Sequence, residues 1–278
     1  SSSNSALINR QIEGTTYSVQ LAWAEPGKIY EKQKHHFYLE PEEGQSGFSF
    51  SCLFTPVDTV SKLPDFESTA SNSKISWEDF WMRGGAVDFS GSTDPRAFEL
   101  ERRVVLSQYL TKAQCAGNYP PQETGLTFNS WHGKFHLEMH WWHGVHFALW
   151  KRADLLEQSL DYYLTVADKA RENASRQGFD GLRWLKMTDP WGDDSPSSVG
   201  SFLIWQQPHI IYMAELCYQN SPREELLRKY AGIIFETADF MASYAWYDTL
   251  ENRYNLGPPL IPAQEPFPAV STSNPPFE

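Results

Sequence analysis

The sequence predicts a mainly α-helical protein with an N-terminal β part. In about the first 56 of its 278 residues, apolar and polar side chains alternate with the period of two that is typical of β-strands. Later in the chain, apolar side chains recur at helical spacing, and nearly uncharged helical segments alternate with amphipathic ones. These patterns indicate strands followed by a helical domain.

The strand signal is clearest in two segments, residues 16–23 and 47–54, with a weaker candidate over 30–39. The segment 47–54 places its apolar side chains on one face of the strand: Phe48, Phe50, Cys52 and Phe54. We therefore predict that residues 1–56 are the end of an N-terminal antiparallel β-sandwich.

A connector is predicted after the strands, because residues 57–75 are rich in Ser, Thr, Pro and Asp. We assign residues 57–94 to a linker. Residues 95–278 are then the helical domain, which we expect to be catalytic.

The first helix of this domain is predicted to begin at Asp94-Pro95, since Asp is a good N-cap and Pro fits the first helical position. It should end before Gly117, where a glycine stops the pattern. Pro208 should kink or divide one of the later helices. Those later helices are expected over residues 133–150, 153–175, 197–218 and 222–244.

The order of these helices predicts a toroid. Helices that are apolar all round belong inside a protein, and one-sided helices belong on its surface. An inner helix followed by an outer one, repeated, is what a toroid of helical hairpins requires. A closed toroid of six hairpins needs twelve helices, and only about five are visible here. We therefore expect only part of such a toroid in this chain.

Composition excludes several classes of partner. The net charge of −12 argues against nucleic acid and against an anionic membrane surface. No apolar run approaches the roughly 18 residues of a membrane span. The three cysteines are widely separated, which excludes a zinc ribbon and argues against a disulfide framework. Aromatic residues make up 15% of the chain, and they could either stack on sugars or fill a large core.

The segment FHLEMHWWH at residues 135–143 has three interpretations. His136 and His140 have the i, i+4 spacing that lets two imidazoles reach one metal ion. The HExxH order is absent, however, and buried histidines also serve as core residues. We favour the third interpretation, a polar and aromatic wall that binds a ligand, and we predict no metal and no organic cofactor.

Three later segments add candidate residues. The loop 186–196 concentrates three carboxylates around Trp191, as a sugar subsite would. Trp205 and Gln206 stand in an apolar helix, where a buried amide needs hydrogen-bond partners. The proline-rich segment 256–266 holds Glu265 rigidly, and apolar surroundings favour the protonated carboxyl that a general acid requires.

Several of these segments resemble six-hairpin glycosidase-like proteins, relatives of glycoside hydrolase families 65 and 95. The resemblance extends from about Trp77 to Glu278 and is carried by three stretches. They are PPQETGLTFNSWHGKFHLEMHWWHGVHFALW (120–150), GLRWLKMTDPWGDDSPS (181–197) and FLIWQQPHIIYMAELCY (202–218). The resemblance implies a β-sandwich, a linker and an (α/α)6 barrel. It also implies inverting cleavage of a glycosidic bond without a metal or organic cofactor.

The resemblance also implies a general acid. Ile261-Pro262-Ala263-Gln264-Glu265 is similar to the acid-bearing loop of such proteins, so Glu265 is our candidate proton donor. Gln264 departs from this pattern, because the relatives usually have proline there. Met139-His140-Trp141-Trp142 is similar to a Met-Asn-Tyr-Trp ending in the fucosidase-like relatives. Lys134 and His136 occupy the positions of their water-binding asparagines, which leaves the sugar open.

The resulting hypothesis is an inverting glycoside hydrolase with Glu265 as general acid and a base beyond residue 278. Inner-helix N-termini face the pocket in such toroids, which favours residues near 131–138. The predicted substrate-binding residues are Trp131, His132, Glu138, Trp141, His143, Asp189, Trp191, Asp193, Trp205, Gln206 and His209.

Three alternatives stay open. A glycoside phosphorylase would cleave the same bond with phosphate and would need an anion site, for which the sequence shows no convincing pattern. A non-catalytic carbohydrate-binding protein would have the pocket without the base. A zinc enzyme is the third alternative. By resemblance alone an extracellular or periplasmic location is expected, and the sequence indicates no oligomeric state.

Overall fold

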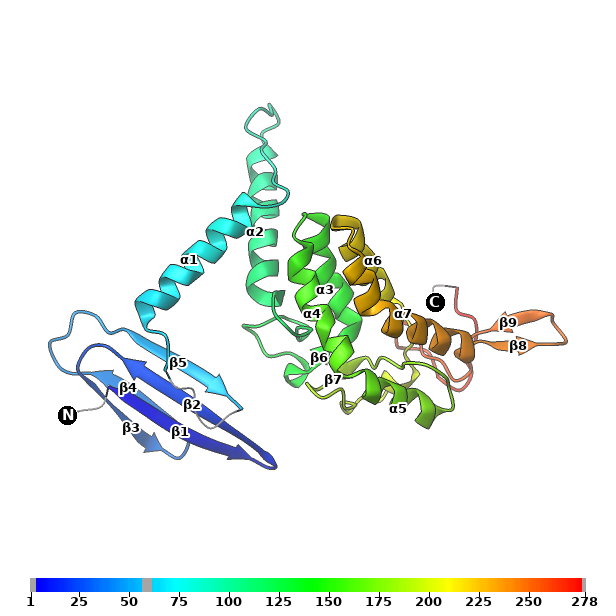
Figure 1. Ribbon diagram of the computed structural model, residues 1–278, viewed down its shortest axis with the longest axis horizontal. Coiled ribbons are helices and arrows are strands. Elements are labelled where there is room, and N and C mark those ends of the chain that lie inside the picture. The colour runs from blue at the N-terminus through cyan, green and yellow to red at the C-terminus, as the bar shows by residue number, and fades with distance from the viewer. Residues whose placement is uncertain (1–3, 57–61, 277–278) are drawn as a thin grey trace. The chain divides into compact units, whose positions relative to one another are not determined.

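A computed structural model describes residues 4–56 and 62–276 of the chain. These residues form two compact units that divide after Met82. The first unit holds the N-terminal strands and one helix, and the second holds the remaining helices (Figure 1). The predicted order of strands followed by helices is therefore confirmed.

The first unit contains two antiparallel sheets. The strands β1, β2 and β5 form the larger sheet in that order, with Ile8 opposite Val19 and Val19 opposite Phe54. A hairpin of β3 and β4 forms the smaller one. The strands are β1 (Ser5–Ile12), β2 (Thr15–Trp23), β3 (Gly27–Gln33), β4 (His36–Pro41) and β5 (Phe50–Thr55). The sequence patterns located β2 and β5 and missed β1.

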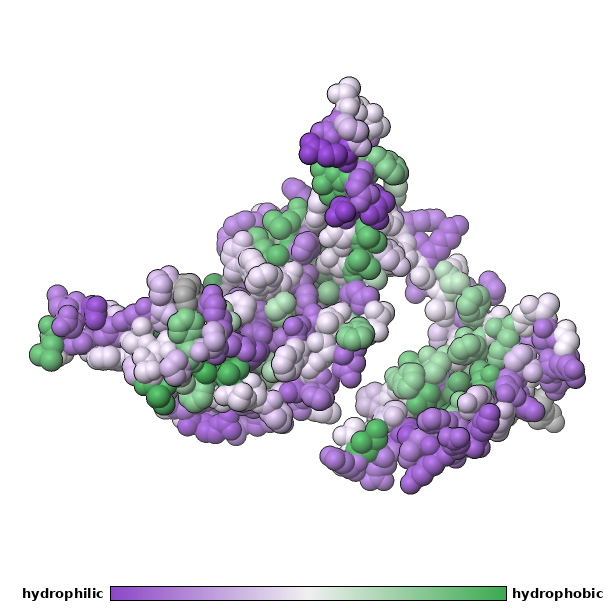
Figure 2. Space-filling model, turned by 180° about the vertical axis from the view of Figure 1, so that it is seen from behind, coloured by the Kyte–Doolittle hydropathy of each residue, from purple (hydrophilic) through white to green (hydrophobic). Residues whose placement is uncertain are grey.

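The predicted apolar face of β5 exists, and β2 contributes to it. Because opposed residues point to the same side of an antiparallel pair, Phe50 and Phe54 share a face with Trp23 and Val19. Val19 and Trp23, in the central strand, are buried, whereas Phe50 and Phe54 at the edge are 50% and 69% exposed. Figure 2 shows hydrophobic side chains gathered on one face of this unit.

A helix, α1 (Phe66–Met82), lies in the stretch that was predicted as a linker. Asp65 caps its first turn by accepting a hydrogen bond from the N–H of Ser68 at 2.7 Å. Phe80, which is 2% exposed, packs edge-on against Trp77 and Trp81. The Ser- and Thr-rich composition concealed this cap and the aromatic side chains that follow it. Residues 57–61 of the predicted linker lie outside the described residues.

The second unit contains six α-helices in its described residues. They are α2 (Ala97–Cys115), α3 (Leu137–Leu149), α4 (Ala153–Thr165), α5 (Ala167–Gln177), α6 (His209–Asn220) and α7 (Glu224–Tyr244). The segment predicted as one helix over 153–175 is interrupted at Val166, so it forms α4 and α5. Pro208 immediately precedes α6, as its lack of an N–H favours.

The predicted helix 133–150 begins later than expected. Phe135–His136 forms a short strand, β6, which pairs with β7 (Met187–Thr188). Leu137 and Glu138, the first residues of α3, then donate their N–H groups to the carbonyl of Lys186 at 2.9 and 3.4 Å. A tertiary contact therefore satisfies the free N–H groups of the helix start, and local sequence could not reveal it.

The core of the second unit lies between α3, α4 and α6. Gly144 of α3 allows close contact, because a Cβ atom there would lie 2.6 Å from the Leu156 side chain of α4. Leu156, Leu160 and Met213 are fully buried in this region. The nearly uncharged α3 buries one side in this core, whereas Trp142 and Leu149 on its other side are 53% and 69% exposed. No described helix is long and apolar enough to cross a membrane.

The end of the chain is tied to this core. A short hairpin, β8 (Trp246–Asp248) and β9 (Arg253–Asn255), leads into a loop over residues 256–276. Ile261 of this loop donates its N–H to the carbonyl of Phe202 at 3.0 Å, and Leu260 donates to Ala269 at 3.1 Å. These bonds position Glu265, whose backbone has a φ of 47°.

Candidate active site

The candidate site is built where the start of α3, the segment before β7 and the C-terminal loop meet. Glu138 comes from the first turn of α3, and Lys186 comes from the residue before β7. Because the backbone carbonyl of Lys186 binds the N–H groups at the start of α3, its side chain is fixed beside Glu138. Glu265 reaches the same place from the loop 256–276.

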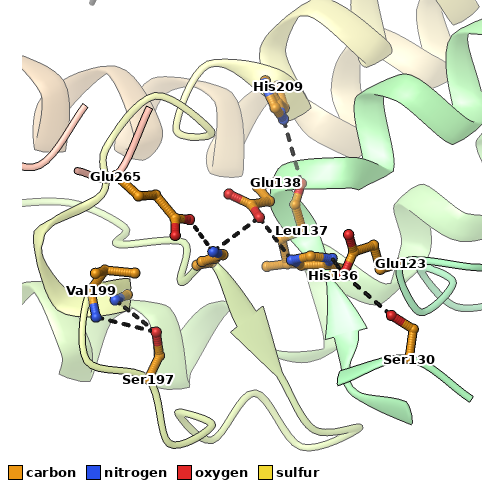
Figure 3. A network of polar contacts seen from close by, with 11 residues as sticks. Glu123, Ser130, His136, Leu137, Glu138, Ser197, Val199, His209 and Glu265 are labelled. Carbon is orange, nitrogen blue, oxygen red and sulfur yellow. Dashed lines mark hydrogen bonds and ion pairs between the residues drawn. The ribbon is translucent and has the colours of Figure 1, made fainter. Parts of the chain in front are cut away.

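A single lysine, Lys186, contacts the carboxylates of both Glu138 and Glu265, which are labelled in Figure 3. The Nζ atom of Lys186 lies 3.3 Å from Oε1 of Glu138 and forms a short ion pair and hydrogen bond with Oε1 of Glu265. Nε2 of His136 lies 2.8 Å from Oε1 of Glu138. We call His136, Glu138, Lys186 and Glu265 the Lys186 cluster.

Burial gives the cluster strong electrostatics. The side chains of Glu138 and Lys186 are each 10% exposed, whereas that of Glu265 is 40% exposed. Burial is the largest influence on Glu138 and acts to raise its pKa, but His136 and Lys186 together lower it. Burial likewise opposes the charged form of Lys186, yet Glu265 and Glu138 raise its pKa. Both groups are therefore charged at neutral pH.

His136 completes the buried side of the cluster. Its ring is 3% exposed, and its Nδ1 atom lies 3.9 Å from Oε2 of Glu123. The close approach of Nε2 to Glu138 is an electrostatic contact, because neither ring nitrogen has a partner at hydrogen-bond geometry. Glu138 is thus held between a lysine and a histidine.

Aromatic residues lie next to this cluster. The ring of His209 packs edge-on against Trp205 at a centroid distance of 4.9 Å and lies 6.2 Å from the ring of Trp141. Nδ1 of His209 lies 3.4 Å from the carbonyl oxygen of Leu137, which links the aromatic group to the start of α3. Burial is the main reason that the pKa of His209 is lowered to about 4, so the ring is neutral.

The predicted residue Gln206 has a structural role in this arrangement. Its Nε2 atom donates to the carbonyl oxygens of Trp184 and Leu203 at 3.0 and 3.1 Å. Its Oε1 atom is buried without a partner. The amide nitrogen of Gln206 therefore holds the segment that precedes Lys186, and its amide oxygen is left as an unpaired hydrogen-bond acceptor.

The predicted acidic loop uses its carboxylates for other contacts. Oδ1 of Asp189 accepts hydrogen bonds from the N–H groups of Trp191 and Asp193, each at 2.9 Å, and so closes the loop. Asp193 forms an ion pair with Lys169 at 2.8 Å. Trp191 is 68% exposed. Short-range turn geometry explains why the acids gather here without joining the Lys186 cluster.

The remaining predicted residues lie around the approach to α3. Trp131 and His132 are exposed and both have positive φ, at 49° and 63°. His143 is half-buried, and its Nδ1 atom has no partner. Burial is the largest cause of its lowered pKa. These three residues stay predicted ligand contacts.

His136 and His140 are not arranged to bind one metal ion together. His140 is fully buried, with Nε2 2.8 Å from Ser159 Oγ and Nδ1 3.1 Å from the Tyr163 hydroxyl. Ser159 already donates its hydroxyl proton to a carbonyl, so its oxygen accepts from Nε2–H of His140. In the described part of the chain, no three His, Cys, Asp or Glu side chains are grouped to hold a metal ion.

Lys186 is the functional candidate that sequence reasoning did not select. It begins the loop that the carboxylates of residues 189–194 brought to attention, and a single lysine there gives no signal of its own. Only the pairing of β6 with β7 brings it to the start of α3. Strand pairing between residues about fifty positions apart could not be read from spacing.

Strands followed by helices are the order expected of six-hairpin glycosidase-like proteins. Two known proteins are similar to this chain. The chain is 21% identical over 210 residues to the 1,2-alpha-glucosylglycerol phosphorylase of Bacillus selenitireducens. Its fold is similar to that of a putative kojibiose phosphorylase from human microbiome, with a TM-score of 0.66 at 11% identity.

The chain spans only part of each of these proteins. The sequence match covers 70% of this chain and 27% of the glucosylglycerol phosphorylase. The structural match covers 93% of this chain and 37% of the kojibiose protein. No family model matches the chain. The predicted resemblance to glycosidase-like relatives of family 65 is confirmed, whereas the predicted hydrolase gains no support because both names describe phosphorylases.

Proposed function

We propose that this chain is part of an inverting glycoside phosphorylase, with Glu265 as the general acid. The observation that carries this proposal is the position of Glu265, on a tethered loop and bound to the lysine that also binds Glu138. Its partly exposed side chain can reach a ligand, while Glu138 is held inside by His136. The names of the two similar proteins support phosphate rather than water as the attacking group.

The proposed reaction balances as follows. Protonated Glu265 gives its proton to the glycosidic oxygen while the bond between that oxygen and the anomeric carbon breaks. A phosphate oxygen forms a new bond to the anomeric carbon from the opposite face. The products are a sugar 1-phosphate of inverted configuration and the released alcohol. Glu265 is left as a carboxylate, which Lys186 is placed to stabilise.

The spacing of the carboxylates indicates which role Glu138 can have. An inverting hydrolase needs a second carboxylate roughly 6.5–9.5 Å from the acid to activate water. One ammonium contacts both Glu138 and Glu265, so their nearest oxygens are closer together than that. Glu138 therefore does not suit the role of water-activating base. Phosphate is already an anion and needs no such base.

We propose that α2–α7 are part of an (α/α)6 toroid and that the ligand is a carbohydrate. The sugar would contact Glu138, Trp141, Trp205 and His209, which lie around the Lys186 cluster, together with the exposed Trp131 and His132.

The test compares the protein, expressed from its full reading frame, with its Glu265→Gln variant. Both are incubated with a panel of disaccharides and glucosides, with and without phosphate. We expect phosphate-dependent release of a sugar 1-phosphate and a rate at least about 100-fold lower in the variant. Glu215→Gln, an exposed carboxylate of α6, serves as the control. Sugar release without phosphate would establish a hydrolase instead, and equal rates in the variant would eliminate Glu265.

A further inference from the structure

We propose that Lys186 and Glu138 are positioning residues that control, in opposite directions, how readily Glu265 holds the proton it must donate. Lys186 favours the carboxylate of Glu265, and Glu138 competes for the same ammonium group. This inference rests on the proposed function, because it takes Glu265 as the acid. It goes further by giving separate and opposed roles to Lys186 and Glu138 in controlling the proton of Glu265.

Lys186 is held in place between two carboxylates. The backbone of Lys186 is fixed by its contact with the start of α3, and its side chain is 10% exposed. From this position it contacts one carboxylate from α3 and one from the C-terminal loop. Any weakening of one contact frees the ammonium for the other. The two carboxylates are therefore coupled through a single cation.

Several titratable groups surround the ammonium group of Lys186. The titratable groups that face it are Glu138 from α3, Glu265 from the loop and, behind Glu138, His136 from β6. Glu123 faces the far side of His136, and His209 of α6 interacts electrostatically with Glu138. With Glu138 and Glu265 both ionised, the charges of Lys186 and the two carboxylates sum to one negative charge. A proton on Glu265 makes the trio neutral.

Catalysis requires that Glu265 be protonated. Glu265 must carry a proton before the glycosidic bond breaks, whereas its contact with Lys186 favours the ionised form. Without Lys186, the proton would bind Glu265 more readily. Without the charge of Glu138, Lys186 would hold the Glu265 carboxylate more strongly, and a repelling negative charge would also be lost. Both of these effects of losing the Glu138 charge would make the proton bind Glu265 less readily.

The test measures kcat/KM against pH for the protein and for Lys186→Met and Glu138→Gln. The alkaline limb of this profile reports loss of the proton from the acid. We expect Lys186→Met to move this limb to higher pH by about one unit or more, and Glu138→Gln to move it to lower pH. Lys186→Arg should stay close to the parent profile. Limbs that move in the same direction, or that do not move, would overturn the inference.

Matched controls come from a second lysine that joins two carboxylates. Lys229 lies 2.6 Å from Asp161 and 3.7 Å from Glu157, outside the Lys186 cluster. Lys229→Met and Glu157→Gln should leave the alkaline limb unchanged. For a variant that turns over too slowly, infrared titration of the protonated carboxyl band, with Glu265→Gln as the reference, reports the same proton directly.

The two proposals fail in distinguishable ways. If Glu265→Gln keeps the parent rate and the parent alkaline limb, then Glu265 is not the acid and the proposed function fails. If Glu265→Gln loses activity but the Lys186 and Glu138 variants do not move the limb in opposite directions, only the present inference fails.

Discussion

The buried guanidinium of Arg183 donates a hydrogen bond to the side-chain oxygen of Gln207, 3.1 Å away. The same oxygen accepts the backbone N–H of Trp184 at 2.7 Å, and the amide nitrogen of Gln207 donates to Leu182 at 3.0 Å. Gln207, in the turn before α6, thus holds the segment that leads to Lys186 in place. This role explains why an amide is found among apolar residues.

Replacing Gln207 should therefore destabilise the second unit. In Gln207→Met the donors of Arg183 and Trp184 and the carbonyl of Leu182 would lose partners inside the protein. Each buried polar group left unpaired costs about 1–3 kcal/mol, so we expect a loss of about 3 kcal/mol or more in the free energy of unfolding. Urea denaturation measures it. Gln219→Met, at an exposed site on α6, should change stability by less than about 0.5 kcal/mol.

Two glycines close to this segment make a matched pair. Both Gly178 and Gly181 have positive φ, at 83° and 68°. A Cβ atom at Gly178 would meet nothing within 4 Å, whereas one at Gly181 would lie 2.0 Å from the backbone oxygen of Glu236. Gly178→Ala should cost about 1 kcal/mol, for the backbone conformation alone. Gly181→Ala should cost at least about 3 kcal/mol more, because backbone atoms would have to move. Equal losses in urea denaturation would contradict this explanation.

The buried His140 should make the stability of the protein fall as the pH falls. Burial is the first cause, before His143 and His209, of the lowering of its pKa from 6.5 to about 3. A group whose pKa is depressed by folding stabilises the protein above its unfolded pKa, and that stability is lost as pH falls toward the folded value. The window therefore runs from about pH 6.5 down to about pH 3, and several kcal/mol are at stake.

The check is chemical denaturation of the protein and of His140→Gln across this window. We expect the variant to be less stable at pH 7 by about 1–3 kcal/mol, because Ser159 and Tyr163 lose their partner. It should also lose less stability than the parent between pH 6.5 and pH 3. His146→Gln, at an exposed position of the same helix, should keep the parent's pH dependence. Parallel curves for the parent and His140→Gln would contradict the assignment.

Periodicity was sufficient to locate most of the helices. The uncharged stretch that ends at Trp150 was correctly predicted as a helix, but only one of its sides is buried, because Trp142, His146 and Leu149 are exposed. Its beginning was placed too early, since Phe135 and His136 pair with a strand about fifty residues away. The helix α1 was missed because its Ser- and Thr-rich sequence gave the same signal as a connector, and only Asp65 marked its beginning.

Sequence patterns pointed to a residue of the candidate site when the residue's own segment carried the signal. Glu138 and His209 were selected from the segments that form α3 and α6, and the structure joins them through Leu137. Asp189 and Asp193 were selected for their number, but carboxylates next to one another often close their own turn, as Asp189 does. Lys186 could not be found, because its partners come from elements distant in sequence.

Trp205 offers a test of the carbohydrate ligand that is separate from catalysis. Its indole Nε1 is buried without a partner, which is uncommon for a tryptophan inside a protein. The residue also lines a cavity of about 390 Å³ together with Pro208, Phe240 and Leu256. A sugar hydroxyl would accept a hydrogen bond from this N–H if the side chains that cover it moved aside on binding.

Trp205→Phe should therefore weaken ligand binding without weakening the fold. Loss of one hydrogen bond of about 0.5–1.5 kcal/mol lowers affinity roughly 2- to 13-fold. Stability should change little, because the donor that is removed is already unpaired in the free protein. Calorimetry with the disaccharide that supports turnover measures the affinity, and urea denaturation measures the stability. Trp191→Phe, on the exposed loop, tests whether any tryptophan in the region has this effect, and we expect it to alter affinity less. An unchanged affinity in Trp205→Phe, with the fold intact, would remove this residue from the binding site.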